Sequence, residues 1–303
     1  MQRKMSISSA RKGRFLSAVG LDRRDVMAAT CGVLLSGLLL GAPGEAGAMD
    51  LAEAFKEHDP MSTRTVDHSL WADLLSAHVR EGDDGVTRVD YASLAASKAD
   101  LEKLGTYLDT LQDTKVSSLS RDEQFAYWAN LYNAVTVEVI LDHYPVRSIR
   151  DINISPGLFS SGPWGKPLVT VEGKELSLDN IEHDILRKNW DEPRVHYAVN
   201  CASYGCPNLA TEPYTGKTLE AQLDAAARAY VNHPRGVRFD GSKLVLSKIF
   251  DWYGKDFGTT RDEQLAAIAA HAAPDLAERL ATHSGRIGYE YDWTLNDTAN
   301  TDS

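Results

Sequence analysis

Apolar residues recur at helical spacing in several stretches of the chain. In SLWADLLSAHVR they stand at positions 70, 74, 75 and 79, and LEKLGTYLDTLQ repeats the spacing at 101, 104, 108 and 111. Residues three or four apart share one face of a helix, so both stretches are predicted to be amphipathic helices. The longest predicted helix is RDEQFAYWANLYNAVTVEVILDHYP. Ser120 is expected to cap it, with Glu123 completing a capping box, and Pro145 is expected to end it.

The pattern changes after Pro145. LVTV and ELSL flank Glu172-Gly173-Lys174, and GVRF and KLVLS flank Asp240-Gly241-Ser242, so each pair is predicted to form a β-hairpin. VHYAVN is predicted to be a strand that ends at Cys201. Helices are predicted for LDNIEHDILRKNW, KTLEAQLDAAARAYVN and RDEQLAAIAAHAAPDLAERLA, the last broken near Pro274. The Gly/Pro/Ser-rich loop ISPGLFSSGPWGKP is a candidate rim of a pocket.

This order of elements predicts an α+β fold. Helices on both sides of two hairpins and a central strand indicate a single domain with a mainly antiparallel sheet packed against several helices. We expect this domain to span residues 69–295, after a flexible lead-in at 49–68 and before a tail at 296–303.

The N-terminus has the pattern of a secretory signal peptide over residues 1–48. A basic stretch leads into the apolar run VMAATCGVLLSGLLLGA, and small residues follow at Ala46 and Ala48. With about 17 residues, the run is shorter than the roughly 20 that span a bilayer, which favours cleavage over the alternative of a membrane anchor. Arg23-Arg24 before the run is typical of twin-arginine export. The sequence therefore predicts a periplasmic or secreted protein without stable membrane insertion after cleavage.

Charge and missing motifs narrow the function. Residues 1–48 hold seven Lys/Arg and three Asp/Glu, so cleavage changes the net charge from −11 to −15. An acidic chain without a basic block repels phosphate backbones, so nucleic acid is not an expected partner. The mature chain lacks GxGxxG, P-loop, HExxH and GxSxG motifs, which argues against the commonest nucleotide, metalloprotease and esterase functions. We expect no cofactor.

Cys201 and Cys206 in VNCASYGCPNL are the principal candidates for chemistry. Because a turn separates them, they are able to form a disulfide, structural or regulatory, in an oxidising compartment. Their spacing does not fit a structural zinc site, and the histidines are scattered singly, so no metal site is predicted. The remaining hypothesis is a catalytic thiol, with Cys201 as the nucleophile.

A catalytic thiol needs a base and an oxyanion site. His183 is the candidate base, because Asp179 stands four residues before it on the predicted helix and could orient its ring. Asn200 or nearby backbone amides are the candidate oxyanion donors. If VHYAVN is a strand, alternation places His196 on the opposite face from Cys201.

Asn130 and Asn133 share one face of the longest predicted helix. Their amides would hydrogen-bond either a peptide or sugar ligand, or the backbone of a buried loop. In the first alternative, Asn130 and Asn133 are candidate binding residues. His196 and Cys206 are two further candidates for binding a ligand.

Four blocks of residues resemble a known family. They are Trp128-x-Asn130-x-Tyr132-Asn133, Ile181-Glu182-His183-x-Ile185-Leu186-Arg187, His196-Tyr197-Ala198 with the stretch from Asn200 to Pro207, and LSKIFDWYGKDF at 246–257. Together they resemble the domain of unknown function family numbered 547, from about residue 62 to 297. That family has no established reaction, so the resemblance implies a fold and candidate residues only. Its bacterial members commonly look like secreted or envelope proteins.

Two functions follow as alternatives. One is a binding or scaffolding module of the cell envelope, with a Cys201–Cys206 loop and a peptide or envelope component as partner. The other is a thiol-dependent hydrolase or acyltransferase that acts on a peptide or amide. A thiol and an imidazole in one concave pocket would favour the enzyme, whereas a bonded cysteine pair with remote imidazoles would favour the binding module.

Overall fold

The computed structural model describes residues 50–157 and 161–300. The predicted signal peptide, residues 1–48, lies outside the described residues and stays a prediction. Within the part that is described, no helix is both long enough and apolar enough to cross a membrane.

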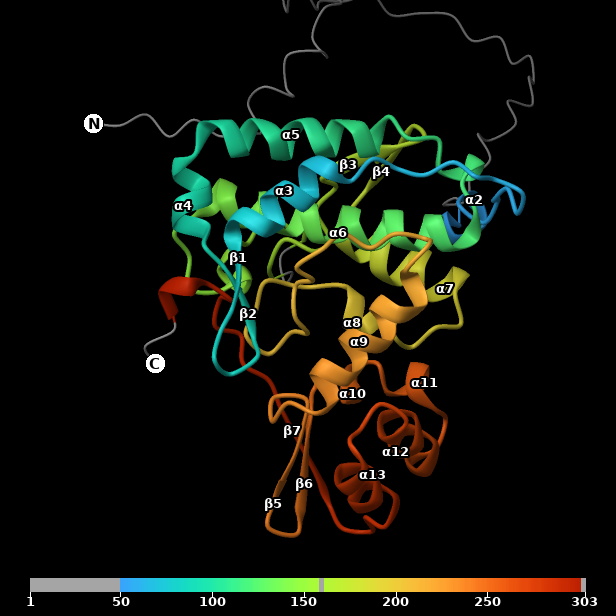
Figure 1. The fold of residues 1–303 in the computed structure, drawn as a ribbon, viewed down its shortest axis with the longest axis vertical. Coiled ribbons are helices and arrows are strands. Elements are labelled where there is room, and N and C mark those ends of the chain that lie inside the picture. The colour runs from blue at the N-terminus through green and yellow to red at the C-terminus, as the bar shows by residue number, and fades with distance from the viewer. Residues whose placement is uncertain (1–49, 158–160, 301–303) are drawn as a thin grey trace, which may run out of the picture. The chain divides into compact units, whose positions relative to one another are not determined.

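Helices form most of the regular structure from Leu51 onward (Figure 1). The predicted helices are present as α3 (Ser69–His78), α5 (Lys98–Gln112), α6 (Arg121–His143), α9 (Leu219–Val231), α12 (Arg261–Ala269) and α13 (Pro274–Ala281). Shorter helices are α2 (Leu51–Ala54), α4 (Tyr91–Ala96), α7 (Arg187–Asn189), α8 (Val195–Ala198), α10 (Ile249–Trp252) and α11 (Gly254–Phe257). Single 3₁₀ turns are η2 (Val116–Ser118), η3 (Ile149–Asp151) and η5 (Thr298–Asn300).

The strands form three small sheets instead of the predicted mainly antiparallel one. Strands β3 (Val169–Val171) and β4 (Lys174–Leu176) form the first predicted hairpin, and β5 (Val237–Asp240) and β6 (Lys243–Ser247) form the second. The sequence did not predict β1 (Val79–Glu81) and β2 (Thr87–Val89), which pair with each other, or β7 (Ile287–Glu290), which lies parallel to β6. The fold is α+β, but its sheets are minor elements.

Helix α6 is the central element of the larger hydrophobic cluster. It is buried on every side from Glu123 to Leu141, so its polar side chains need partners inside the protein. The Ser120 side chain caps it as predicted, accepting a hydrogen bond from the Glu123 N–H at 3.4 Å. Half of the predicted capping box is absent, because the Glu123 carboxylate instead accepts from the N–H groups of Val66 and Gly216.

The buried apolar residues fall into two clusters instead of the single core that we expected. The larger surrounds α6 and includes residues of α3, α5 and the β3–β4 hairpin. The smaller contains residues of α9, β5, β6, α10, α12 and α13. Figure 1 shows β5, β6, α12 and α13 together at the lower end and α3 and α5 at the upper end. The 199–206 loop, which carries the candidate cysteines, contributes Val199 and Ala202 to the larger cluster.

One local prediction is wrong, and buried residues lie in both segments that were expected to flank the domain. VHYAVN is not a strand, because Val195–Ala198 forms one turn of helix, α8. The turn begins where the carbonyls of residues 192–194 accept hydrogen bonds from the N–H groups of residues 195–197. The lead-in at 49–68 contains Phe55, whose buried ring lies 4.9 Å from that of Trp128. The predicted tail at 296–303 begins with Asn296 and Asp297, which are both buried.

The predicted helix LDNIEHDILRKNW has a wide turn that its sequence does not reveal. Residues Asn180–Leu186 form a π-helix, η4, which continues into α7. π-helical turns are uncommon and occur often at functional sites. This one carries Glu182 and His183.

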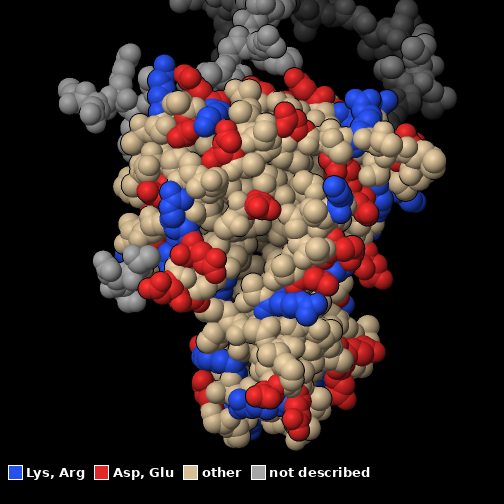
Figure 2. Space-filling view, viewed as in Figure 1, with Lys and Arg blue, Asp and Glu red and all other residues tan. Residues whose placement is uncertain are grey.

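Acidic and basic side chains are interspersed on the face shown in Figure 2. No continuous basic area is visible on that face among the described residues. Mixed charges of this kind are typical of a solvated surface.

Candidate functional site

A cavity of about 430 Å³ brings the cysteines and the imidazoles to one place. Its volume is within the usual range of roughly 300–1,000 Å³ for small-molecule sites. The candidate residues that line it are Asp179, His183, His196, Cys201 and Cys206. Aromatic side chains form much of the remaining wall: Tyr132, Trp164, Trp252, Tyr253, Tyr291 and Trp293. The loop predicted to be a rim, residues 155–167, contributes Ser155, Ser161, Trp164 and Gly165.

Buried amides hold the cysteine loop in place. The Asn133 side chain donates to the Ala198 carbonyl at 2.9 Å and accepts from the Asn200 N–H at 2.8 Å. The Asn200 side chain donates to the Pro207 carbonyl at 2.7 Å and accepts from the Ala202 N–H at 2.8 Å. These bonds fix both ends of the turn, in which Ala202 takes a left-handed φ of 59°. The local backbone is therefore ordered before any ligand arrives.

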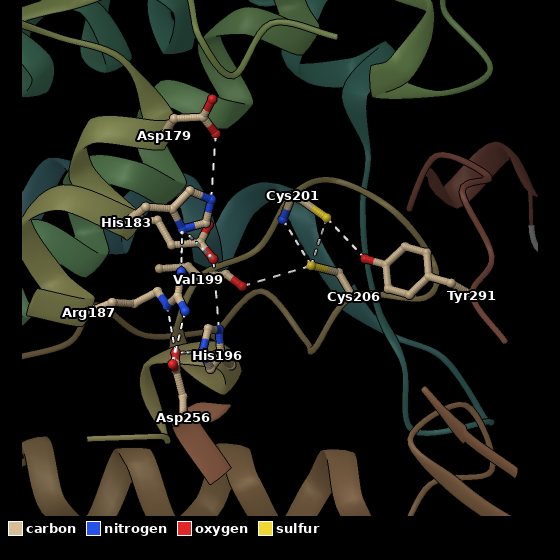
Figure 3. Close-up of polar contacts among 10 residues, drawn as sticks. Asp179, His183, Arg187, His196, Val199, Cys201, Cys206, Asp256 and Tyr291 are labelled. Atoms are coloured by element: carbon tan, nitrogen blue, oxygen red, sulfur yellow. Dashed lines mark hydrogen bonds and ion pairs between the residues drawn. The ribbon is translucent and has the colours of Figure 1, made fainter. Parts of the chain in front are cut away.

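The two thiols lie side by side without a covalent bond. Both are free cysteines, and their sulfurs are 3.0 Å apart, so the predicted disulfide is absent from this structure. Cys201 Sγ also lies 3.3 Å from Ser203 Oγ. It lies 3.1 Å from the Tyr291 hydroxyl (Figure 3). Cys201 is partly exposed, whereas Cys206 is buried with an exposed fraction of 4%.

This environment makes the two thiols unequal. Hydrogen bonds from Cys206, Ser203 and Tyr291 together lower the pKa of Cys201, although burial opposes the shift. Burial raises the pKa of Cys206 well above its usual value, and the bond that it donates to Cys201 adds to that effect. Cys201 is therefore the thiolate candidate, and Cys206 is its proton-bearing neighbour.

His183 is part of a separate polar group on the other side of the view in Figure 3. Its Nδ1 lies 3.3 Å from Arg187 Nη1, and its Nε2 lies 3.7 Å from Asp179 Oδ1. Because a guanidinium only donates, Nδ1 accepts, and the ring proton resides on Nε2, facing Asp179. The pairing of His183 with Asp179 agrees with the prediction. The predicted contact between a histidine base and the thiol is not present: among the described residues, no hydrogen bond connects His183 or His196 to either sulfur.

His196 belongs to a buried ion-pair network. Its Nε2 lies 2.7 Å from Asp256 Oδ2, and Arg187 binds the same carboxylate through two nitrogens at 2.6 and 2.9 Å. Burial alone would raise the pKa of Asp256, but the bonds from His196 and Arg187 hold it well below its usual range. The ring of His196 also stacks on Tyr253 at 4.2 Å, so this network fixes an aromatic wall of the cavity.

The predicted oxyanion donors are engaged elsewhere. The Asn200 amide binds Pro207, as described above. The N–H of Cys201 donates to Cys206 Sγ at 3.0 Å, and those of Tyr204 and Gly205 donate to the carbonyls of Thr294 and Asp292. The N–H of Cys206 donates to the Ser203 carbonyl. The hydroxyl groups near Cys201 are thus the nearer candidates for that role.

Asn130 has a structural partner as well. Its side chain donates to the Tyr214 carbonyl at 2.8 Å and accepts from the Tyr214 N–H at 3.0 Å. Neither Asn130 nor Asn133 lines the cavity. The geometry agrees with the alternative in which both amides tie down buried loop backbone.

The sequence did not identify several residues of the site. Tyr291 and Trp293 follow β7, which had no clear strand pattern, and they reach the cysteines from ninety residues away in the chain. Trp252 and Tyr253 lie in IFDWYGKDF, an aromatic stretch whose sequence carries no pattern that indicates a cavity wall. Ser203 was part of the predicted turn, with nothing to indicate its contact with Cys201.

The described residues contain no group of three or more His, Cys, Asp or Glu side chains arranged to hold a metal ion.

The predicted family resemblance is confirmed over part of the chain. The model of the family described as "Protein of unknown function, DUF547" matches residues 116–231. This segment contains α6, η4 and the cysteine loop, and it is shorter than the 62–297 that we expected, so the block LSKIFDWYGKDF lies outside it. A comparison with curated proteins found no match, and neither did a comparison with solved structures.

Proposed function

We propose that this is an exported envelope protein that carries out thiol-dependent acyl chemistry, hydrolysis or acyl transfer, on a peptide or amide. The observation that supports the proposal best is the position of Cys201. The residue is partly exposed and lines the aromatic cavity, and its sulfur has three hydrogen-bonding neighbours that stabilise its thiolate. The predicted signal peptide at 1–48 supports the location.

In the proposed reaction, Cys201 Sγ attacks the acyl carbon without an adjacent histidine base. The C–S bond forms while the carbonyl electron pair moves to oxygen, where the Tyr291 hydroxyl is the nearest donor. The C–N bond then breaks, and the leaving amine takes a proton. Solvent water supplies it, because His183 Nδ1 accepts from Arg187 and the Nε2–H of the same ring faces the Asp179 carboxylate across the cavity. Water, or another amine, finally attacks the thioester and restores the thiol.

The lining of the cavity indicates the class of substrate. Asp179 and Glu182 are the formally charged side chains of the lining, and both are acidic; the walls around them are Trp and Tyr rings. Carboxylates among aromatic rings favour a cationic or amine-bearing group, which the rings attract through their negative faces. The proposed substrate is therefore an acyl compound or peptide that carries a positive charge near the bond that breaks.

The binding or scaffolding module is the second candidate. It is favoured by one observation: the histidines lie apart from the sulfurs and have other partners. In that case the same cavity would hold a cationic peptide without turnover.

Trapping of the thioester separates the two. The mature chain from Met49 would be mixed with acylated amides and esters that carry a lysine-like, a neutral or an acidic group. We expect a mass gain of one acyl group on the peptide that contains Cys201, strongest for the cationic substrate, and none in Cys201→Ser. Asp179→Asn should reduce the preference for the cationic substrate. Saturable binding without any adduct or product would instead favour the binding module.

A further inference from the structure

In the proposed acyl chemistry the second thiol of the pair serves only as a hydrogen-bond donor to Cys201. Cys206 is buried beside the partly exposed Cys201, and its sulfur lies 3.0 Å from that of Cys201. It also accepts the Cys201 N–H at 3.0 Å and approaches the Val199 carbonyl at 3.8 Å. These contacts hold Cys206 Sγ against Cys201 Sγ, and a shift of about 1 Å would bring the two to the roughly 2.05 Å of a disulfide.

The division of properties between the thiols is that of an attacking and a resolving cysteine. The attacking thiol of such a pair must reach the substrate and be ionised, and the resolving thiol must be shielded until the first bond has formed. Cys201 is partly exposed at the cavity, with hydrogen-bond donors around its sulfur, whereas Cys206 is buried and hydrogen-bonds to that sulfur. The order of attack is thus fixed by access.

We propose that Cys201 and Cys206 form a dithiol pair that reduces a disulfide-bearing substrate. This further activity uses the same nucleophile as the proposed acyl chemistry, Cys201, but is a different reaction. Cys201 thiolate attacks one sulfur of the substrate disulfide. A mixed disulfide forms, and the other substrate sulfur leaves as a thiolate that takes a proton from solvent. Cys206 then loses its proton and attacks Cys201 Sγ. The Cys201–Cys206 bond forms, the second substrate sulfur leaves, and the substrate has gained two electrons and two protons.

The cavity defines the form of this substrate. A disulfide in an extended peptide or in a small amine-bearing compound would enter between the Trp and Tyr rings, with its positive charge near Asp179 and Glu182. An acidic disulfide would be repelled by the same carboxylates. Cystamine and glutathione disulfide, one cationic and one acidic, are therefore matched probes.

Mass spectrometry of the reduced mature chain tests the proposal. Both cysteines lie between Arg194 and Lys217 with no Lys or Arg between them, so trypsin releases them in one peptide. With cystamine, the wild-type peptide should lose the mass of two hydrogens, and two molecules of free cysteamine should appear for each protein chain. Cys206→Ser should stop at the mixed disulfide and keep one cysteamine on Cys201. Cystamine should react faster than glutathione disulfide, and Asp179→Asn should narrow that difference.

Two results would overturn the proposal. One is a wild-type protein that accumulates the mixed disulfide as Cys206→Ser does, because Cys206 would then not be resolving it. The other is a Cys201→Ser variant that reacts as fast as the wild type. Thermal unfolding of each variant is measured first. If Cys206→Ser does not fold, the mass of the wild-type peptide still tests the proposal. A Cys201–Cys206 disulfide lowers that mass by two hydrogens, whereas a mixed disulfide raises it by one bound cysteamine. Acyl-adduct formation is read on a separate substrate, so either activity can fail alone.

Discussion

The hydroxyl of Tyr291 lies 3.1 Å from the sulfur of Cys201, although ninety residues separate them in the chain. Burial and the neighbouring cysteines raise the pKa of this tyrosine well above its usual value, so the phenol keeps its proton. Tyr291 is consequently a fixed donor toward a sulfur that ionises more readily than a free cysteine. This relationship makes the cysteine loop dependent on the C-terminal segment of the chain.

Replacement of Tyr291 by Phe should raise the pKa of Cys201. A hydrogen bond to a charged group contributes about 1.5–3 kcal/mol, which corresponds to roughly one to two pKa units. The measurement is the rate of alkylation of Cys201 by iodoacetamide as a function of pH. Tyr289→Phe is the control, because Tyr289 is near in sequence and does not line the cavity. An unchanged midpoint in Tyr291→Phe would show that the phenol does not stabilise the thiolate.

Asn133→Ala should destabilise the protein and loosen the cysteine loop together. The substitution removes the partners of the Ala198 carbonyl and of the Asn200 N–H, both inside the core. Two unsatisfied buried groups cost about 2–4 kcal/mol in the free energy of unfolding. Asn130→Ala is the matched comparison, because that amide holds Tyr214, away from the cysteines. Urea unfolding should show a similar loss for both, but only Asn133→Ala should change the alkylation rate of Cys201.

The sequence predicted the parts of the fold whose signal is local. Helix α6 has a cap, a proline after its end and apolar residues throughout, and the hairpins β3–β4 and β5–β6 have glycine in their turns. The strand prediction for VHYAVN failed because its β-branched and aromatic residues favour a strand, whereas hydrogen bonds from the N–H groups of residues 195–197 to the carbonyls of residues 192–194 close a helical turn. The hydrogen bonds of this helical turn therefore outweighed the intrinsic preference of these residues for a strand.

The candidate site was predictable only in its residue types. Cys201, Cys206 and His183 do line one cavity, as the hypothesis of a catalytic thiol requires. Asn200 hydrogen-bonds backbone groups of its own loop. His183 has its predicted partner, Asp179, and also contacts Arg187. The actual neighbours of Cys201 include Tyr291, and a contact across ninety residues leaves no periodic signal in a single sequence.

Asp256→Asn should destabilise the protein in a pH-dependent way. The pKa of Asp256 in the folded protein lies below that of the unfolded chain, so its contribution is fully present above about pH 4 and declines as the pH falls toward the folded value. Because the carboxylate is partly exposed, we expect a loss of about 2 kcal/mol at pH 7, less than for a fully buried pair. Urea unfolding at pH 7 and at successive values below 4 should show the gap to wild type narrowing.

The exposed Asp251 provides the control for this experiment. Asp251→Asn removes the same charge from the next-to-last residue of α10 and should leave the stability within about 0.5 kcal/mol of wild type. If the difference in unfolding free energy between wild type and Asp256→Asn stays constant down to pH 3, the ionised Asp256 carboxylate does not stabilise the protein through His196 and Arg187.

Gly205→Ala should separate the cysteine loop from the segment that carries Tyr291. A Cβ at position 205 would lie 2.8 Å from both the N and the O of Asp292, and these are backbone atoms held by the bond from the Gly205 N–H to the Asp292 carbonyl. One of the two segments must move, so we expect a loss of about 1–3 kcal/mol in the free energy of unfolding.

Gly105→Ala is the control for this substitution. Nothing lies within 4 Å of its added Cβ inside α5, and alanine there should stabilise the protein by about 0.5–1 kcal/mol. Because the displaced segment carries Tyr291, Gly205→Ala should also slow the alkylation of Cys201 at neutral pH. A destabilised Gly205→Ala protein with unchanged Cys201 reactivity would show that the thiolate does not depend on this contact between the two segments.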